Sequence, residues 1–161
     1  MKKPALLKAI IARLDAELAL SLHAARAAAA GATDAQNKAE NKYDTRGLEL
    51  SYLAAGQGRQ MAEAEATIQQ LRTLALRDFG PRDPIDLSAV IVLESRKKLA
   101  HTPPLYFLAP RGGGTEVRYA GRDFLVITPQ SPLGQQLLGR RQGDIISCGH
   151  NITAQRIAKV C

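Results

Sequence analysis

One apolar stripe runs through the first thirty residues and restricts the fold more than any other feature of the chain. Its side chains recur at alternating spacings of four and three residues, which places them along one side of an α-helix. Pro4 suits the first turn of such a helix, because its missing N–H would be unpaired there anyway. The stripe consists of Leu7, Ile11, Leu14, Leu18, Ser21, Ala25 and Ala28. We therefore expect a long amphipathic helix that ends in an alanine run before Gly31.

A second stripe with nearly the same spacing lies within residues 48–76. Glutamate and glutamine side chains fall off it, as expected for the solvent side of a helix. Glycine and two prolines follow within residues 79–84 and cannot continue a helix. The stripe consists of Leu50, Leu53, Gln57, Met61, Ala64, Ile68, Leu71 and Ala75. The sequence thus predicts a second helix and a boundary segment at 79–84.

Two helices of similar length, each with one narrow apolar side, bury those sides most simply against each other. A rise of about 1.5 Å per residue makes each helix about 40 Å long. If Leu7 lies near Ala75, the chain must reverse within a tip segment of residues 31–49. We therefore expect an antiparallel coiled-coil hairpin over residues 1–78, a long projection suited to reaching into another molecule.

The pattern changes to short strands and turns after residue 84. Runs rich in Val, Ile, Leu, Phe and Tyr predict strands at 89–93, 104–108, 116–119, 124–127 and 152–160, and the glycines at 112–114 predict a hairpin turn. Ser131 followed by Pro132 predicts the start of a short helix at 133–138, which Gly139 ends. The fold class expected for the chain is α+β, with the small second domain at residues 85–161.

Composition excludes several classes of protein. Charged residues interrupt the apolar N-terminal stretch, so no segment reaches the roughly 20 uncharged residues of a membrane span. The basic start at Lys2 and Lys3 is followed by proline and acids rather than an apolar core, which argues against a signal peptide and favours the cytoplasm. The formal net charge is +7, and its excess lies after residue 80, where it suits a polyanion or an acidic protein equally.

No motif predicts a catalytic or metal centre that belongs to this chain alone. The glycines at 112–114 lack the Lys-Ser/Thr sequence and the strand-to-helix context of a phosphate-binding loop. Cys148 and His150 have no second pair of ligands for zinc. His23 and His101 have no evident nucleophile beside them. These residues therefore predict no phosphate-binding loop, no zinc site and no hydrolytic triad, and the chain is expected to carry no cofactor of its own.

Residues 128–144 resemble the C-terminal signature of the bacterial Gre-type transcript cleavage factors. In that family Ser-Pro precedes a short helix that ends Leu-Gly-Lys, and Gly-Asp begins the next strand; here the stretch reads TPQSPLGQQLLGRRQGD. Residues 40–43 and 51–55 are similar to the Glu-Asn and Tyr-x-Ala-Ala pieces of the family's hairpin tip, at a different spacing. The order of the parts also agrees, so the resemblance covers nearly the whole chain.

The resemblance implies a bacterial transcription elongation regulator. Gre factors dock an FKBP-like domain on the rim of the secondary channel of RNA polymerase and insert the hairpin, whose acidic tip helps hold a second Mg²⁺ and its water for cleavage of backtracked RNA. Such a protein is no enzyme itself, contacts RNA or DNA within the elongation complex, needs no membrane and is expected to be a monomer.

The same resemblance indicates the residues of two sites. The tip carboxylates are Glu40, Asp44 and Glu49, of which Asp44 and Glu49 are the expected ligands of an Mg²⁺ ion shared with RNA polymerase. The residues expected to contact the polymerase from the second domain are Ser131, Pro132, Leu133, Arg140 and Arg141.

The tip departs from the family pattern, which leaves alternatives open. One register puts Thr45 and Leu48 where the family carries its acidic pair, and the other retains Glu40 but replaces its partner with Asn37. The first alternative is therefore a Gre-like protein that binds the polymerase, competes for the channel and does not stimulate cleavage. The second is a coiled-coil adaptor unrelated to transcription.

Structural explanations also exist for the candidate residues. Glu40 and Asp44 stand four apart, as exposed opposite charges do on a solvated helix beside Lys38, Lys42 and Arg46. Ser131 and Pro132 are explained completely by a helix start. Arg140 and Arg141 suit either an acidic partner or the negative end of the helix dipole.

Overall fold

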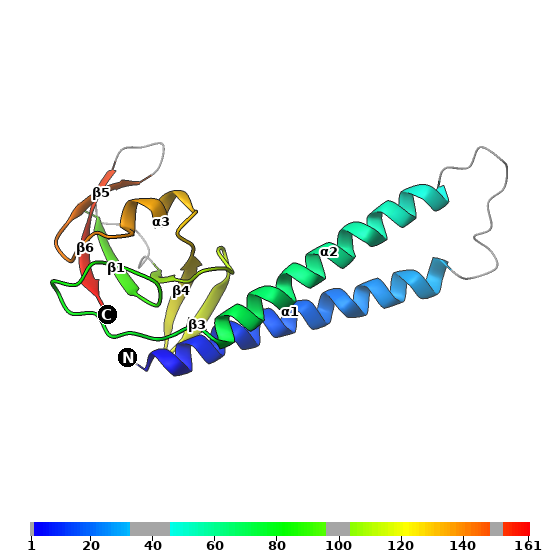
Figure 1. Ribbon diagram of the computed structural model, residues 1–161, viewed down its shortest axis with the longest axis horizontal. Coiled ribbons are helices and arrows are strands. Elements are labelled where there is room, and N and C mark those ends of the chain that lie inside the picture. The colour runs from blue at the N-terminus through cyan, green and yellow to red at the C-terminus, as the bar shows by residue number, and fades with distance from the viewer. Residues whose placement is uncertain (1, 33–45, 96–103, 149–152) are drawn as a thin grey trace.

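The computed structural model describes residues 2–32, 46–95, 104–148 and 153–161. Two long helices, α1 (Lys3–Ala32) and α2 (Arg46–Arg72), come first, and a six-stranded mixed sheet with one short helix follows. The predicted α+β class is confirmed. The two long helices run side by side in opposite directions and project from the sheet, and their far ends spread apart (Figure 1).

Helix α2 ends at Arg72, four residues before the predicted end. Its last turn tightens, with the Leu74 N–H donating to the carbonyl of Leu71. The chain then becomes irregular and carries Leu74 and Leu76 against the core under the sheet. Ala75, the last residue of the predicted stripe, is exposed, whereas Leu74 and Leu76 are half-buried against the core that α1, α2 and the sheet share.

The sheet contains all of the predicted strands in the order β3-β4-β2-β1-β6-β5. Strands β2 and β4 are parallel, and the other neighbours are antiparallel. The strands are β1 (Val90–Ser95), β2 (Leu105–Leu108), β3 (Glu116–Tyr119), β4 (Arg122–Ile127), β5 (Ile145–Cys148) and β6 (Thr153–Val160). The short helix α3 (Pro132–Leu137) lies between β4 and β5 in the chain.

The prediction of a hairpin at glycines 112–114 is wrong. A turn exists there, closed by the Thr115 N–H donating to the Gly112 carbonyl, but the strands on its two sides do not pair. Because β2 pairs in parallel with β4, the chain must cross over before β3, which then takes the edge of the sheet. The hairpin lies between β3 and β4, where Ala120 and Gly121 both have positive φ.

Each face of the sheet buries its own core. On one face, Leu137 of α3 packs with Ile91, Ile127 and Ile157 from the strands. On the other, the base of the helical pair packs on the sheet. That second core includes Leu6, Leu7, Ile10, Leu71, Val90, Leu105, Phe107, Phe124 and Val126. Full burial of such a side chain stabilises the fold by about 1.5–3 kcal/mol. Several buried side chains therefore stabilise the contact between the base of the helical pair and the sheet.

No helix in the described part of the chain is long and apolar enough to cross a membrane.

Candidate functional site

Of the three tip carboxylates predicted from the sequence, only Glu49 falls within a described helix. Glu40 and Asp44 lie outside the described residues, as does Asp34. Glu49 belongs to the first turns of α2, and its side chain is not among those described. Ala32 and Arg46, which bound residues 33–45, stand at the ends of the helices that point away from the sheet (Figure 1). The segment is therefore attached to the helices at those ends.

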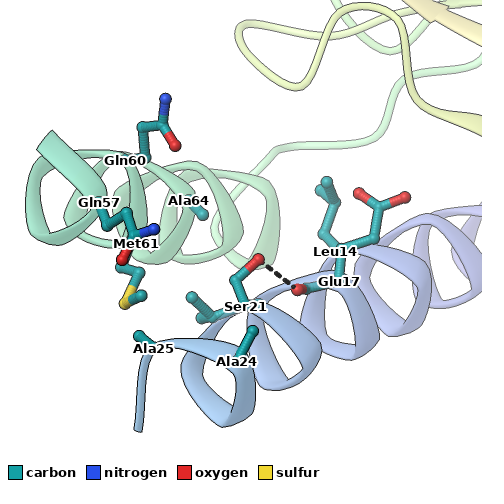
Figure 2. Close-up of a pocket in the computed structure, with 10 residues that line it drawn as sticks. Leu14, Glu17, Ser21, Ala24, Ala25, Gln57, Gln60, Met61 and Ala64 are labelled. Atoms are coloured by element: carbon teal, nitrogen blue, oxygen red, sulfur yellow. Dashed lines mark hydrogen bonds between the residues drawn. The ribbon is translucent and has the colours of Figure 1, made fainter. Parts of the chain in front are cut away.

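A cavity of about 400 Å³ separates α1 and α2 in the middle of the pair (Figure 2). Small side chains such as Ala25 and Ala64 leave the space unfilled where leucines fill it nearer the sheet. The Ser21 hydroxyl donates to the carbonyl of Glu17, 3.0 Å away, which satisfies it within its own helix. The lining is Leu14, Glu17, Leu18, Ser21, Ala24, Ala25, Gln57, Gln60, Met61 and Ala64. It holds one carboxylate and no histidine or cysteine, so it offers no evident catalytic chemistry.

The predicted contact residues of the second half gather around α3. Ser131 is the N-cap, with φ −68° and ψ 151°, and its hydroxyl oxygen accepts from the Gly134 N–H at 3.1 Å. The same hydroxyl donates to the Thr128 carbonyl at 2.7 Å. Pro132 takes the first turn, exposed, and Leu133 is half-buried against the core. The predicted helix start is confirmed, and it leaves Pro132 on the surface.

The two arginines follow the other end of α3. Six residues of helix separate them from Ser131, a distance of about 9 Å along the axis. The Gly139 N–H donates to the Ile85 carbonyl at 2.8 Å and the Ile85 N–H donates to the Arg140 carbonyl at 2.7 Å, which ties this end to the segment before β1. The structure therefore places the two groups at opposite ends of one short helix.

Arg140 and Arg141 differ in their surroundings. The Arg141 Nε donates to the Arg82 carbonyl at 3.0 Å, and its backbone N–H donates to the Asp144 carboxylate at 2.9 Å. Within the described part of the chain, the guanidinium of Arg140 makes no hydrogen bond or ion pair, and the residue is exposed. Arg141 thus stabilises the turn through its hydrogen bonds, whereas the side chain of Arg140 is exposed and available to a partner.

Two apolar side chains that sequence reasoning missed are exposed close to these arginines in the chain. Leu138 is 45% exposed at the end of α3, and Ile145 is 61% exposed at the start of β5. Ile145 faces away from the core that buries its neighbour Ile146. The signal available in the sequence was the Ile-Ile pair, since only one of two consecutive strand residues can face a given core.

The electrostatics of the described residues provide no metal centre. No group of three or more His, Cys, Asp or Glu side chains in this part of the chain could hold an ion. Cys148 contributes no described side chain, and His150 lies outside the described residues. Burial lowers the pKa of Lys3, which lies at the base of the helical pair rather than beside α3.

Comparisons with known proteins give matches to solved structures alone. No protein-family model matches the chain, and no curated protein does. The crystal structure of GreA factor homolog 1 from Thermus thermophilus is 22% identical in sequence and matches with a TM-score of 0.38, over 96% of this chain and 96% of that one. The protein of the same name from Thermus aquaticus is also 22% identical, with a TM-score of 0.35, over 95% of this chain and 94% of that one.

Proposed function

We propose that this chain is a cytoplasmic regulator of transcription elongation that binds RNA polymerase. In this proposal residues 1–78 form an antiparallel coiled-coil hairpin, residues 79–84 a linker, and residues 85–161 an FKBP-like domain that docks at the rim of the polymerase secondary channel. The hairpin enters the channel and carries residues 31–49 towards the catalytic centre, beside the RNA or DNA of the elongation complex. The protein acts as a monomer.

The observation that carries this proposal is the pairing of one projection with one docking surface. The helices α1 and α2 extend from the sheet, and α1 ends at Ala32 and α2 begins at Arg46 on the side away from it (Figure 1). The motif that resembles the Gre signature forms α3 and the following turn on the sheet, with Pro132, Leu138 and Arg140 exposed. Such a regulator needs a surface that binds the polymerase and a projection long enough to enter the channel.

The chemistry proposed for the tip is to supply carboxylate oxygens. Glu40, Asp44 and Glu49 provide the hard oxygen ligands that Mg²⁺ prefers, with Asp44 and Glu49 as the pair that contacts an ion shared with the polymerase. Such an ion, when bound, orients and activates water for attack on a phosphodiester. The chain's own task is to hold these oxygens in place, so no catalytic turnover is expected from it alone.

One observation favours a second candidate function, in which the protein binds the channel without stimulating cleavage. Neither register of the tip aligns two acids with the acidic pair of the Gre pattern, because Thr45 and Leu48 or Asn37 take those positions. A regulator of this kind would compete with cleavage factors for the same entrance.

Backtracked elongation complexes with 3′-labelled RNA distinguish these functions. The wild-type protein and the variant Glu40→Ala/Asp44→Ala/Glu49→Ala are added with and without Mg²⁺, and binding and RNA length are measured together. Shortened RNA with the wild type and at least tenfold slower shortening with the variant support assisted cleavage. The matched control is Glu63→Ala/Glu65→Ala, which removes exposed acids from the middle of α2 and should cleave as the wild type does.

Binding without shortened RNA would instead establish the second candidate. Absence of binding to the polymerase would refute both functions and leave an adaptor for another partner.

A further inference from the structure

The first turn of α1 meets the segment that follows α2 at the base of the helical pair. Lys3 is 5% exposed there, and its Nζ donates to the carbonyl of Arg77. The same Nζ lies 4.6 Å from the centroid of the Phe79 ring, and the Arg77 guanidinium carbon lies 5.2 Å from it. The aromatic ring, itself 7% exposed, therefore contacts a cation from each of two segments that are 74 residues apart.

The turn before β1 also contacts the segment that follows α2. The Arg77 N–H donates to the Ser88 hydroxyl at 2.9 Å, and the Ser88 N–H donates to the Leu108 carbonyl at 2.8 Å. Ser88 is fully buried and has φ 70°, a left-handed backbone that serine adopts at a cost. Asp86 adds an ion pair with Arg77 at 3.5 Å. Arg77 is thus bonded through its carbonyl to α1 and through its amide to the sheet.

These directed contacts differ from the apolar contacts beside them. The burial of Leu6, Leu7 and Ile10 stabilises the base but is non-directional, so it permits small rotations of the pair on the sheet. Hydrogen bonds weaken steeply as their angles change, so a chain of them resists such rotation. Burial of the Lys3 ammonium removes its hydration and so costs free energy. The same desolvation lowers the pKa of Lys3, and Asp78 and Cys161 only partly oppose that shift. A methionine would fill the space without this cost, but it could not donate to Arg77.

We propose that Lys3, Arg77, Phe79 and Ser88 form a clamp that sets the direction of the helical pair relative to the sheet. This inference rests on the proposed function for its purpose. A helix of 30 residues is about 45 Å long, so a rotation of about 10° at the base moves its far end by about 8 Å. An error of 1 Å at a reacting centre can already lower a rate about 100-fold. Lys3 is therefore a positioning residue for groups that it never touches.

The direction of the pair can be measured in the free protein. Spin labels are attached through a ketone amino acid at Arg59 on α2 and at Gln142 in the turn before β5, both exposed, which leaves the cysteines unchanged. Pulsed electron paramagnetic resonance then gives the distribution of distances between them. The wild type should give one narrow distribution, and Lys3→Met should at least double its width. Phe79→Leu and Ser88→Ala, which remove other parts of the clamp, should widen it as well.

Two controls separate positioning from stability. Lys8→Met changes an exposed lysine on the same helix and should leave the distribution narrow. Ile157→Val, in the core on the other face of the sheet, should lower the melting temperature without widening the distribution. A wild-type distribution that is already broad, or a Lys3→Met distribution as narrow as the wild type, would overturn the proposal.

The same variants, tested on backtracked complexes, separate the failure of the clamp from that of the proposed function. A widened distribution with at least tenfold lower activity on the polymerase supports both. If the wild type has no activity on the polymerase, the proposed function fails, and the distance measurement still decides the clamp.

Discussion

Two residues of this chain have roles that their type alone would not predict. Gly134 sits inside a six-residue helix, where glycine weakens the fold, and Lys3 is buried, where lysine is rarely found. In both cases the reason is a backbone carbonyl, of Thr128 for the glycine and of Arg77 for the lysine. The Thr128 carbonyl belongs to the turn just before α3, and the Arg77 carbonyl lies 74 residues from Lys3 in the chain, so residue type alone predicts neither role.

Replacement of Gly134 by alanine should destabilise the protein by about 2 kcal/mol or more. An added Cβ would lie 1.9 Å from the Thr128 carbonyl oxygen, so α3 would have to shift away from the loop that the Ser131 cap holds. Urea unfolding measures the change. The neighbouring variant Gln135→Ala, at an exposed position, should change the free energy of unfolding by less than about 0.5 kcal/mol. An unchanged midpoint for Gly134→Ala would contradict the close approach.

The burial of Lys3 predicts a rise of stability at alkaline pH. Desolvation lowers the pKa of Lys3 in the folded chain below its ordinary value of 10.5, so between the two values the unfolded chain binds more protons than the folded chain. The free energy of unfolding should therefore increase with pH as 10.5 is approached from below and reach its limit above it. Subtracting the same titration of Lys3→Met removes the contributions of tyrosines and cysteines. A difference that is flat or falls with pH would contradict the prediction.

At the scale of elements, local sequence patterns predict the positions of the helices and strands. The predictions are wrong where a side chain is buried by a segment other than the one assumed. The N-cap at Ser131 and the end at Gly139 were predicted within a residue, because capping chemistry acts over one turn. The end of α2 was placed four residues too late, since Leu74 and Leu76 are half-buried against a core that includes the sheet and not only α1. The glycine turn was assigned to a hairpin because a turn signal says nothing about which strands pair.

The cavity between α1 and α2 coincides with weak helix formers. Gly56 and Gly58 lie in α2 with nothing within 4 Å of an added Cβ, beside the lining residues Gln57 and Gln60. Small side chains across from them leave little contact to compensate for the flexibility of glycine. The middle of the pair is therefore held less firmly than its base, where leucines and isoleucines are fully buried.

Gly58→Ala should stabilise α2 by about 0.5–1 kcal/mol, because alanine restricts the unfolded chain and meets no obstacle in the folded helix. Amide hydrogen exchange of α2 reports the change locally, and circular dichroism should show slightly higher helicity. The mirror variant Ala62→Gly, at an exposed position one turn later, should weaken protection by a similar amount. Faster exchange in Gly58→Ala would indicate that the glycine has a packing role.

At the scale of the whole molecule, the helical pair and the sheet share one core. Leu6 and Ile10 from α1 and Leu71 from α2 are fully buried against Phe107 and Phe124. The prediction of a projection on a compact base did not include this common core, because an apolar stripe shows that a helix face is covered but not by what. The first turns of α1 therefore pack against the sheet, while its later turns belong to the projecting part of the helical pair.

Leu6→Ala should destabilise the whole chain by about 2–5 kcal/mol, because it removes a fully buried side chain at the shared core. In a Tyr43→Phe/Tyr52→Phe background, where fluorescence comes from Tyr106 and Tyr119 in the sheet, the loss should be the same by tyrosine fluorescence and by helical circular dichroism. Leu20→Ala, at a position 72% exposed on the same helix, should change stability by less than about 0.5 kcal/mol. Separate transitions for helix and sheet would show that the two parts are not coupled through this core.

Periodicity, caps and turn residues were sufficient to predict where the helices and strands lie and that their class is α+β. They were sufficient because these signals act between residues a few positions apart. The helix start at Ser131 and Pro132 lies where it was predicted, whereas the exposure of Leu138 and Ile145 was not predicted; the contact of these residues with a partner stays a prediction. The tertiary structure alone decided the parallel pairing of β2 with β4, the need for Gly134, and the joining of Lys3 to Arg77. The strand pairing and the Lys3 contact join segments that are distant in the chain, and the Gly134 contact depends on how residues 128–134 fold back on themselves. An alternation of apolar and polar residues records that a side chain is buried without recording its partner.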